Sequence, residues 1–313
     1  MKATARALAG LGAGLALLLP AAAAPLRVLT TTPPLQSLAA DIAGPHGQVE
    51  NWLAGGGDPH DFQFPARDLR RLREADVLIV NGLGLETWLQ RAIERAGKPA
   101  GLRVIEAAAG IPESQLILGE CPGHDHDHHA HAHGHDHAHA PNPHVWLDPV
   151  LARHLVTNIA RALVAADPAH AGAYEASAAA LSARLEALHG DFALRLAPVQ
   201  RQAFIVFHDA FPYLVRRYAL RQAGVVEEAA SVEPSARHLT ALGATVRAEG
   251  VRVMFLEPGA RSRLAQRLAR DWRLQLATLD PLETAAESGP GAYEAAMRRN
   301  LDALVAALQP AAL

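Results

Sequence analysis

The sequence of 313 residues predicts an α/β protein with two (β/α)4-type lobes that one long, rigid α-helix bridges. Two observations support this fold class. Short β-like runs alternate with helical patterns in both halves of the chain, which is typical of parallel sheets covered by helices. Between the halves, no proline follows Pro168 until Pro198, and Ala, Leu, Glu and Arg dominate. A helix of about 30 residues is roughly 45 Å long, which is too long for the inside of one small lobe.

Residues 1–23 have the pattern of a secretory signal peptide. Lys2 and Arg6 make the start of the chain positive, residues 7–19 are apolar, and the small residues that follow offer a cleavage site. The apolar run is shorter than the roughly 20 residues that span a bilayer. We therefore expect cleavage after residue 23 and a mature protein that diffuses freely in the periplasm.

The composition limits the partners and the covalent chemistry of the chain. The net charge of −3 argues against nucleic acid or an anionic membrane as a partner. Cys121 is the only cysteine, so no internal disulfide forms, and no cysteine directly after the apolar run offers a site for a lipid. About 290 mature residues are enough for two lobes with their own cores, and we expect a monomer. Whether Cys121 binds metal is left open by the sequence.

The first lobe is predicted over residues 24–166. Its strands are expected at Arg27–Thr32, Val49–Leu53, Val77–Asn81 and Arg103–Ile105. Its helices are expected at Leu35–Ile42, Ala66–Ala75, Leu85–Ala96 and Val150–Ala165. Pro65 fits the start of the second of these helices, because a proline in the first turn loses no hydrogen bond. The alternation predicts a parallel sheet with helices on both faces.

The bridging helix is predicted over residues 167–197 and the second lobe over residues 198–313. Asp167 fits the N-cap of the bridging helix and Pro168 fits its first turn. The strands of the second lobe are expected at Ala203–Phe207, Ala223–Val226, Val251–Leu256 and Leu274–Leu279. Its helices are expected at Tyr213–Ala219, Ser235–Glu249, Arg261–Arg270 and Ala292–Leu308. Because clefts between lobes are common ligand sites, we expect the functional site between these two lobes.

A histidine-rich segment interrupts the first lobe and predicts a disordered loop over about residues 119–142. Its centre reads HDHDHHAHAHGHDHAH, with nine histidines and three aspartates. Imidazole and carboxylate groups bind transition metals, but a tract of Gly, Ala, His and Asp has no fixed geometry. The tract therefore predicts weak, accessory metal ligands at His124, His126, His128, His129, His131, His133, His135, His137 and His139. The alternative is a solvated low-complexity linker without a role in metal binding.

Eight histidines lie outside the tract, and their local patterns separate them into two groups. Five occur in polar-faced helical patterns or in a turn and are expected to be solvated, namely His46, His154, His170, His189 and His238. The other three follow predicted strands or loops beside Gly, Pro or Asp, in the segments GGGDPHDF, NPHVWLDP and FIVFHDAF. They are His60, His144 and His208, and Asp280 similarly leaves the last predicted strand in TLDPL.

These four residues predict a metal site in the cleft between the lobes. In open α/β sheets, ligands bind outside the carboxyl ends of the strands, where His60, His144, His208 and Asp280 are expected. Three imidazoles and one carboxylate suit Zn(II), whereas Mn(II) is less favoured by so many nitrogen ligands. Each histidine could instead cap a helix or fill a core. Asp280, which precedes Pro281, could merely cap a turn.

The segment GGGDPHDFQFPARDLRRLREADVLIVNGLGLETWL resembles the signature stretch of metal-specific solute-binding proteins of ABC transporters, a family that includes zinc (ZnuA-type) and manganese receptors. NPHVWLDP, the long helix, FIVFHDAFPYL, VEPS, FLEPG and TLDPL follow in the order and spacing of that family. The resemblance covers nearly the whole mature chain. It implies two βα lobes, a rigid bridging helix, and metal ligands at His60, His144 and His208.

The same resemblance implies the metal and the task. Manganese receptors of the family tend to carry glutamate where this chain has His208, and zinc receptors commonly carry a His/Asp-rich loop before the second ligand. Both features imply a protein that captures Zn(II) as its cargo in the periplasm and delivers it to an inner-membrane ABC permease. One departure is Pro59, since some zinc members place glutamate directly before the first ligand. The fourth ligand is thus either Asp280 or water.

Three other functions compete with a zinc receptor. A manganese receptor of the same family is the first alternative. A secreted zinc hydrolase would also use three protein ligands and an open position, but the sequence has no H-E-x-x-H motif and no evident general base beside the histidines. Glu233 and Glu257 are the nearest candidates for such a base. A metal buffer that works through the tract alone would not explain histidines at the strand ends of two lobes. We therefore expect a binding protein and no enzyme.

Overall fold

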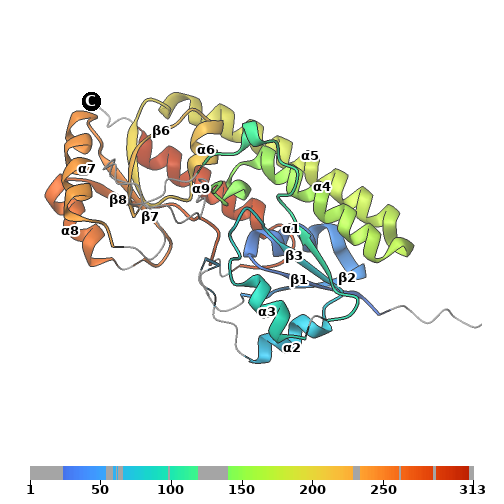
Figure 1. Ribbon diagram of the computed structural model, residues 1–313. Helices are drawn as coiled ribbons and strands as arrows, with labels where there is room; N and C mark the ends of the chain where they lie inside the picture. The colour runs from blue at the N-terminus through green and yellow to red at the C-terminus, as the bar shows by residue number, and fades with distance from the viewer. Residues whose placement is uncertain are drawn as a thin grey trace, which may run out of the picture.

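The computed structural model describes residues 24–53, 59–60, 62, 66–97, 99–118, 140–227, 233–260, 262–284 and 287–309. Two α/β lobes lie along a pair of long helices, and loops from both lobes meet between the two sheets (Figure 1). The predicted fold class is confirmed. The predicted signal peptide, the nine histidines of the tract and Cys121 lie outside the described residues.

The first lobe contains a four-stranded parallel sheet with the order β2-β1-β3-β4. The strands are β1 (Leu26–Thr30), β2 (Gly47–Asn51), β3 (Val77–Val80) and β4 (Arg103–Glu106). The helices that cover the sheet are α1 (Pro33–Ala43), α2 (Ala66–Glu74) and α3 (Leu89–Arg95). All four residues of β3 are buried and apolar, as expected for an inner strand that helices cover on both faces.

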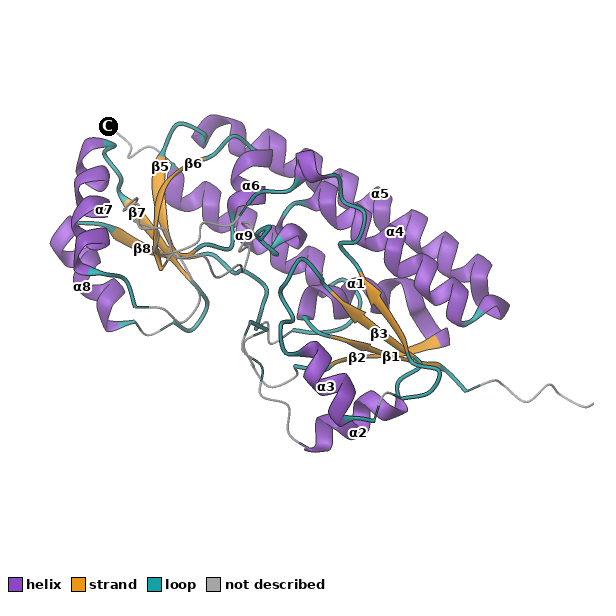
Figure 2. Cartoon of the chain, viewed as in Figure 1, coloured by secondary structure: helices purple, strands orange, loops and turns teal. Residues whose placement is uncertain are grey.

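The second lobe repeats this topology with the order β6-β5-β7-β8, again parallel throughout. The strands are β5 (Ala203–His208), β6 (Arg221–Glu227), β7 (Val253–Leu256) and β8 (Gln275–Thr278). The helices are α6 (Pro212–Arg217), α7 (Ala236–Ala248), α8 (Arg263–Trp272) and α9 (Ala292–Leu308). Figure 2 shows the two sheets at separate ends of the molecule, with helices around each.

Two long helices pack side by side along one side of the molecule and form an antiparallel hairpin (Figure 2). They are α4 (Pro149–Ala166) and α5 (Ala171–Leu196), joined by the 3₁₀ turn Pro168–His170. Asp148 caps α4 by accepting a hydrogen bond from the backbone N–H of Val150. The long helix of the predicted fold is therefore α5, with 26 residues, and 3₁₀ turns occupy both ends of the predicted range.

The side chains of α5 explain why it serves as a bridge. Its buried residues recur at helical spacing over its whole length: Tyr174, Ala178, Leu181, Leu185, Leu188, Phe192 and Leu196. They belong to a hydrophobic cluster that also includes Val28 of β1 and Phe204 of β5. One continuous core therefore runs through both lobes, and separating them would expose apolar surface to water.

A second element, α9, also connects the lobes, although the sequence predicted only one bridge. It follows the last strand of the second lobe and packs against α1 and α5 (Figure 1). Just before α9, the backbone N–H of Gly291 donates to the Asp41 carboxylate of α1 over 2.8 Å. The backbone N–H of Tyr293 donates to Ser37 Oγ over 2.9 Å, and its buried hydroxyl donates to the carbonyl of Trp146 over 2.6 Å. The two lobes are thus held together at two places.

None of the helices in the described part of the chain is long and apolar enough to cross a membrane.

Because α5 and α9 both hold the lobes, we expect metal binding to change the overall shape very little. Small-angle scattering profiles of the metal-free and zinc-loaded protein should superpose. The double variant Trp146→Phe/Tyr293→Phe loses two hydrogen bonds at the lobe junction, each of which stabilises it by about 0.5–1.5 kcal/mol, and should be less stable to urea. A clear compaction of the wild-type protein on zinc binding would contradict a rigid junction.

Candidate metal centre

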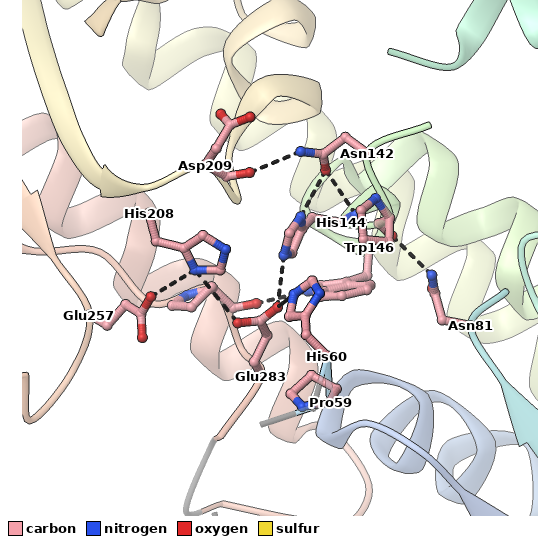
Figure 3. Close-up of polar contacts among 12 residues, drawn as sticks. Pro59, His60, Asn81, Asn142, His144, Trp146, His208, Asp209, Glu257 and Glu283 are labelled. Carbon is pink, nitrogen blue, oxygen red and sulfur yellow. Dashed lines mark hydrogen bonds and ion pairs between the residues drawn. The ribbon is translucent and has the colours of Figure 1, made fainter. Parts of the chain in front are cut away.

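The three histidines predicted as ligands lie together between the lobes (Figure 3). The ring centroids are 5.4 Å apart for His60 and His144, 5.2 Å for His144 and His208, and 6.0 Å for His60 and His208. The carboxylate that joins them is that of Glu283. One ligand atom from each of these four residues lies within 4.8 Å of all the others. Two of the residues come from each lobe, as the sequence predicted for the site.

Aromatic packing places His60 in the loop after β2. The carbonyl of the preceding Pro59 accepts a hydrogen bond from the indole of Trp88 over 2.8 Å. The Trp88 ring packs against Phe62 and Trp52, with ring centroids 5.1 and 5.2 Å apart. The His60 side chain keeps 25% of its surface exposed and is the most accessible of the four. Its Nε2 lies 3.1 Å from Glu283 Oε1.

His144 lies directly before the 3₁₀ turn Val145–Leu147, which leads into α4, and it is almost completely buried. Its Nδ1 is 2.8 Å from Asn142 Oδ1, and its Nε2 is 2.7 Å from Glu283 Oε1. Burial lowers the pKa of His144, since the charged ring loses its hydration, although the carboxylate of Glu283 acts in the opposite direction. The imidazole therefore gives up its proton readily, and a metal ligand must be unprotonated.

His208 is the last residue of β5, and its Nδ1 lies 2.8 Å from Glu257 Oε1 and 3.8 Å from Glu283 Oε2. Burial by itself would lower the pKa of His208. The hydrogen bond to Glu257 and the negative charges of Glu283, Glu257 and Asp209 outweigh that effect and raise the pKa to about 9. In the metal-free protein at neutral pH, His208 is therefore an imidazolium that must lose a proton before it can bind metal.

Glu283 lies in the loop after β8 and is 6% exposed. Its Oε1 is shared by His60 and His144. Burial alone would raise the pKa of this carboxyl group, but the positive charges and hydrogen bonds of the three histidines lower it well below its usual range. The preceding Leu282 has a φ of +64°, so the backbone turns sharply here and directs Glu283 into the cluster. A carboxylate among three imidazoles is thus ionised and ready to bind a cation.

The structure corrects the predicted fourth position. The carboxylate of Asp280 is not in the cluster and accepts a hydrogen bond from the backbone N–H of Leu282 over 2.8 Å. Its backbone N–H donates to Asn300 Oδ1 over 2.8 Å, and its carbonyl accepts from Asn300 Nδ2 over 2.7 Å. Asp280 therefore caps the turn that leads to Glu283, which was the alternative that the Asp280-Pro281 pair had left open.

Glu283 was missed because the direction of this turn cannot be read from the sequence. The only signal was its position in TLDPLE, three residues after Asp280 at the same strand end. The turn is held from the other lobe as well, because the indole of Trp146 donates to the carbonyl of Pro281 over 2.8 Å. Contacts of this kind, between segments 135 residues apart, have no sequence pattern.

The five histidines that the sequence predicted to be solvated lie outside this cluster. Among the described residues, the five remaining histidines lie elsewhere. The ring of His46 stacks on that of His170, His154 and His238 contact backbone carbonyls, and His189 contacts a tyrosine hydroxyl. The structure describes the residues on either side of the tract, where Leu118 and Pro141 form an antiparallel bridge directly before Asn142.

Three imidazoles and one carboxylate form a donor set that suits zinc. Tetrahedral zinc with bonds of about 2.0–2.1 Å holds its ligand atoms roughly 3.3 Å apart. The four donor atoms already lie within 4.8 Å of one another. Side-chain movements of about an ångström would therefore bring them onto a zinc ion, without closure of the lobes.

The sequence matches the family described as ZnuA, zinc-uptake complex component A periplasmic, over residues 28–307. This chain belongs to that family. The match spans both lobes and the helices between them, and it confirms the resemblance that the sequence motifs indicated. The description of the family is that of a component of a zinc-uptake complex, a protein of metal transport.

Individual relatives support the same assignment. The zinc-binding protein AdcA of Streptococcus pyogenes is 30% identical over 290 residues, which are 89% of this chain and 55% of AdcA. This chain thus spans only about half the length of the AdcA relatives. A protein of Treponema pallidum that is named for metal binding is 31% identical over 277 residues, covering 88% of this chain and 85% of that protein.

A solved structure shows the same architecture. The SBP FpvC of Pseudomonas aeruginosa, in complex with Mn²⁺, matches with a TM-score of 0.76 and 31% identity. The match covers 91% of this chain and 99% of FpvC. The arrangement of two lobes around long helices is therefore shared with a metal-loaded member of the same class of binding protein.

The geometry predicts different roles for the two carboxylates near β8. Glu283→Gln should weaken zinc binding by at least about 100-fold, because a charged ligand is lost. Asp280→Asn is the matched control: it is the same change of carboxylate to amide, but its Oδ1 still accepts the Leu282 hydrogen bond. Its zinc affinity should stay within about threefold of the wild type. Competition with a chromophoric chelator measures both, and equal losses in the two variants would refute the assignment of Glu283.

The raised pKa of His208 predicts that zinc affinity depends on pH. Zinc needs the neutral ring, and a ring with a pKa of about 9 carries a proton at pH 7. Binding should therefore release at least about one proton, and affinity should rise about tenfold per pH unit up to roughly pH 9. Calorimetry in buffers of different ionisation enthalpy counts the protons. Glu257→Gln should lower the pKa of His208 and end the rise at a lower pH, and a flat profile for the wild type would contradict this account.

Proposed function

We propose that this protein captures Zn(II) in the periplasm and delivers it to an ABC-type permease of the inner membrane. The observation that carries the proposal is the cluster of His60, His144, His208 and Glu283 between the lobes, in which His144 and Glu283 are buried. The description of the family as a zinc-uptake component and the name of the AdcA relatives support zinc as the cargo. The protein performs no bond chemistry, since binding and release are its whole task.

The donor set favours zinc over manganese. Three of the four donors are imidazole nitrogens, which suit zinc, whereas manganese prefers carboxylate and water oxygens. The similarity to FpvC, which was solved with Mn²⁺, keeps a manganese receptor as the second candidate. A competition between the two ions for the wild-type protein separates these candidates.

The exposure of the ligands suggests the order of capture. His60 is the accessible member of the cluster, whereas His144 and Glu283 are almost completely buried. The ion would meet His60 first and then displace the protons of the inner ligands. For release, the permease would need to move the Glu283 loop, which Trp146 and Asn300 hold through backbone contacts. Loss of the buried carboxylate would leave the three imidazoles with a weaker hold on the ion.

We propose that the histidine tract serves as an accessory collector. Leu118 and Pro141, which flank the tract, are paired, and the backbone N–H of Asn142 donates to the carbonyl of Ile117 over 2.7 Å. Two residues after Asn142 comes His144, so the tract leaves the fold close to the cluster. Several weak sites at this point would raise the local metal concentration and pass ions to the tight site.

The location follows from the predicted signal peptide. We propose that residues 1–23 are removed on export and that the mature protein works as a monomer in the periplasm. The description of the family as periplasmic supports this location.

A zinc titration tests the proposed function. The wild type should show one tight site and several weak ones. The triple variant His60→Ala/His144→Ala/His208→Ala should lose the tight site and keep the weak ones. Deletion of residues 123–140 should do the reverse, and it leaves residues 119–122 as a short turn between the paired ends Leu118 and Pro141.

The same titration rejects the alternatives. An unchanged isotherm for the triple variant would indicate a metal buffer that works through the tract. Loss of the tight site in the tract deletion would show that the division between site and collector is wrong. Turnover of ester or peptide substrates by the zinc-loaded wild type would indicate a hydrolase.

A further inference from the structure

The side chain of Asn142 makes hydrogen bonds on both sides of the metal cluster. Its Oδ1 lies 2.8 Å from His144 Nδ1 and 3.1 Å from the backbone nitrogen of His144. Its Nδ2 donates to the carbonyl of Asp209 over 2.9 Å, and Asp209 directly follows His208. One amide group therefore touches a ligand from the first lobe and the backbone beside a ligand from the second (Figure 3).

The partners of Asn142 determine which way its amide points. The Asp209 carbonyl can only accept a hydrogen bond, so the NH₂ group must face it. The backbone N–H of His144 can only donate, so the oxygen must face that side. Both requirements give the same orientation, which leaves Oδ1 as a pure acceptor beside His144 Nδ1. The Nδ1 atom must therefore carry the hydrogen.

This hydrogen determines what the other nitrogen of His144 can do. A neutral imidazole has one N–H and one lone pair, so the lone pair lies on Nε2, which points at Glu283 Oε1 from 2.7 Å. Two acceptors at this distance need a proton or a cation between them. The hydrogen bond at Nδ1 thus leaves the ring with its lone pair directed into the cluster.

We propose that Asn142 is a positioning residue for metal binding. It holds His144 in the Nδ1–H tautomer and, through the Asp209 carbonyl, fixes the position of His144 relative to His208. The proposal rests on the proposed function, because it concerns the same site. Ligating histidines are commonly oriented by a hydrogen bond at their second nitrogen. Here the same side chain also ties the two lobes together.

The backbone around Asn142 leaves its side chain little freedom. The N–H of Asn142 donates to the carbonyl of Ile117, and its own carbonyl accepts from the hydroxyl of Tyr213 over 2.7 Å. The same hydroxyl accepts from the N–H of Ile117 over 3.2 Å. Asn142 is only 6% exposed, and both its backbone N–H and its backbone carbonyl are hydrogen-bonded. A residue fixed this firmly can transmit its orientation to His144.

An asparagine can accept a hydrogen bond from His144 and donate one to the Asp209 carbonyl, whereas an aspartate can make only the first of these contacts. Aspartate keeps the acceptor for His144 but has no hydrogen for the Asp209 carbonyl. Alanine has neither. Comparison of the two variants therefore separates the tautomer from the link between the lobes.

The test measures zinc affinity and the protonation of His144 in purified protein. Asn142→Ala should raise the zinc Kd by about 10- to 100-fold, the usual effect of removing such a partner. In ¹H–¹⁵N spectra of the zinc-loaded wild type, the Nδ1–H signal of His144 should be protected from exchange. In Asn142→Ala that protection should be lost, and in Asn142→Asp both the protection and most of the affinity should return.

Asn158→Ala is the matched control. Asn158 is also an asparagine in the first lobe, and its Nδ2 donates to the carbonyls of Ala107 and Ala109 over 2.9 and 2.8 Å. Its loss should affect stability but leave the zinc Kd unchanged. A zinc Kd for Asn142→Ala no higher than that of Asn158→Ala would overturn the proposal, as would an unprotected Nδ1–H in the wild type. Failure of the wild type itself to bind zinc would instead refute the proposed function.

Discussion

The attraction between one buried carboxylate and three imidazoles organises the region where the lobes meet. Glu283 follows the last strand of the second lobe, and the histidines that surround it come from three other segments of the chain. A buried negative charge is costly unless positive or hydrogen-bonding groups compensate it. The cluster supplies them in the absence of metal, through protons that a metal ion would replace. The same groups therefore stabilise the metal-free fold and form the candidate metal site, where a cation would replace protons in a frame that already exists.

That frame is rigid because the site and the lobe junction use the same residues. Trp146 lies two residues after His144, and its indole and carbonyl contact the Glu283 loop and the start of α9, respectively. The ligands are thus held by the same hydrogen bonds that hold the lobes. Preorganisation of this kind increases affinity, because little conformational freedom is lost on binding. Release of an ion from such a site would accordingly require the junction to be disturbed.

Much of the fold and three residues of the candidate site could be predicted from the sequence. His60, His144 and His208 were predictable as a group, because the carboxyl ends of parallel strands share one edge of a sheet and the flanking Gly, Pro and Asp residues mark loops. The elements also lie close to their predicted ranges, because the periodicity of apolar residues is set by the helix or strand itself. Glu283 was not predictable. Its position depends on the positive φ of Leu282 and on a hydrogen bond from Trp146, and neither leaves a local pattern. The second connection through α9 was missed for the same reason.

The pairing of Leu118 with Pro141, at the two ends of the histidine tract, has a consequence for how many residues the insertion can hold. Leu118 and Pro141 are joined by an antiparallel bridge, so the two ends of the insertion meet at one point of the first lobe. Adding residues between ends that already meet costs little, since each doubling of a flexible loop changes its closure free energy by only about 0.6 kcal/mol. A change in the number of histidines between these ends would therefore leave Asn142 and His144 in place. The length of the tract and the geometry of the candidate metal centre are thus independent of each other.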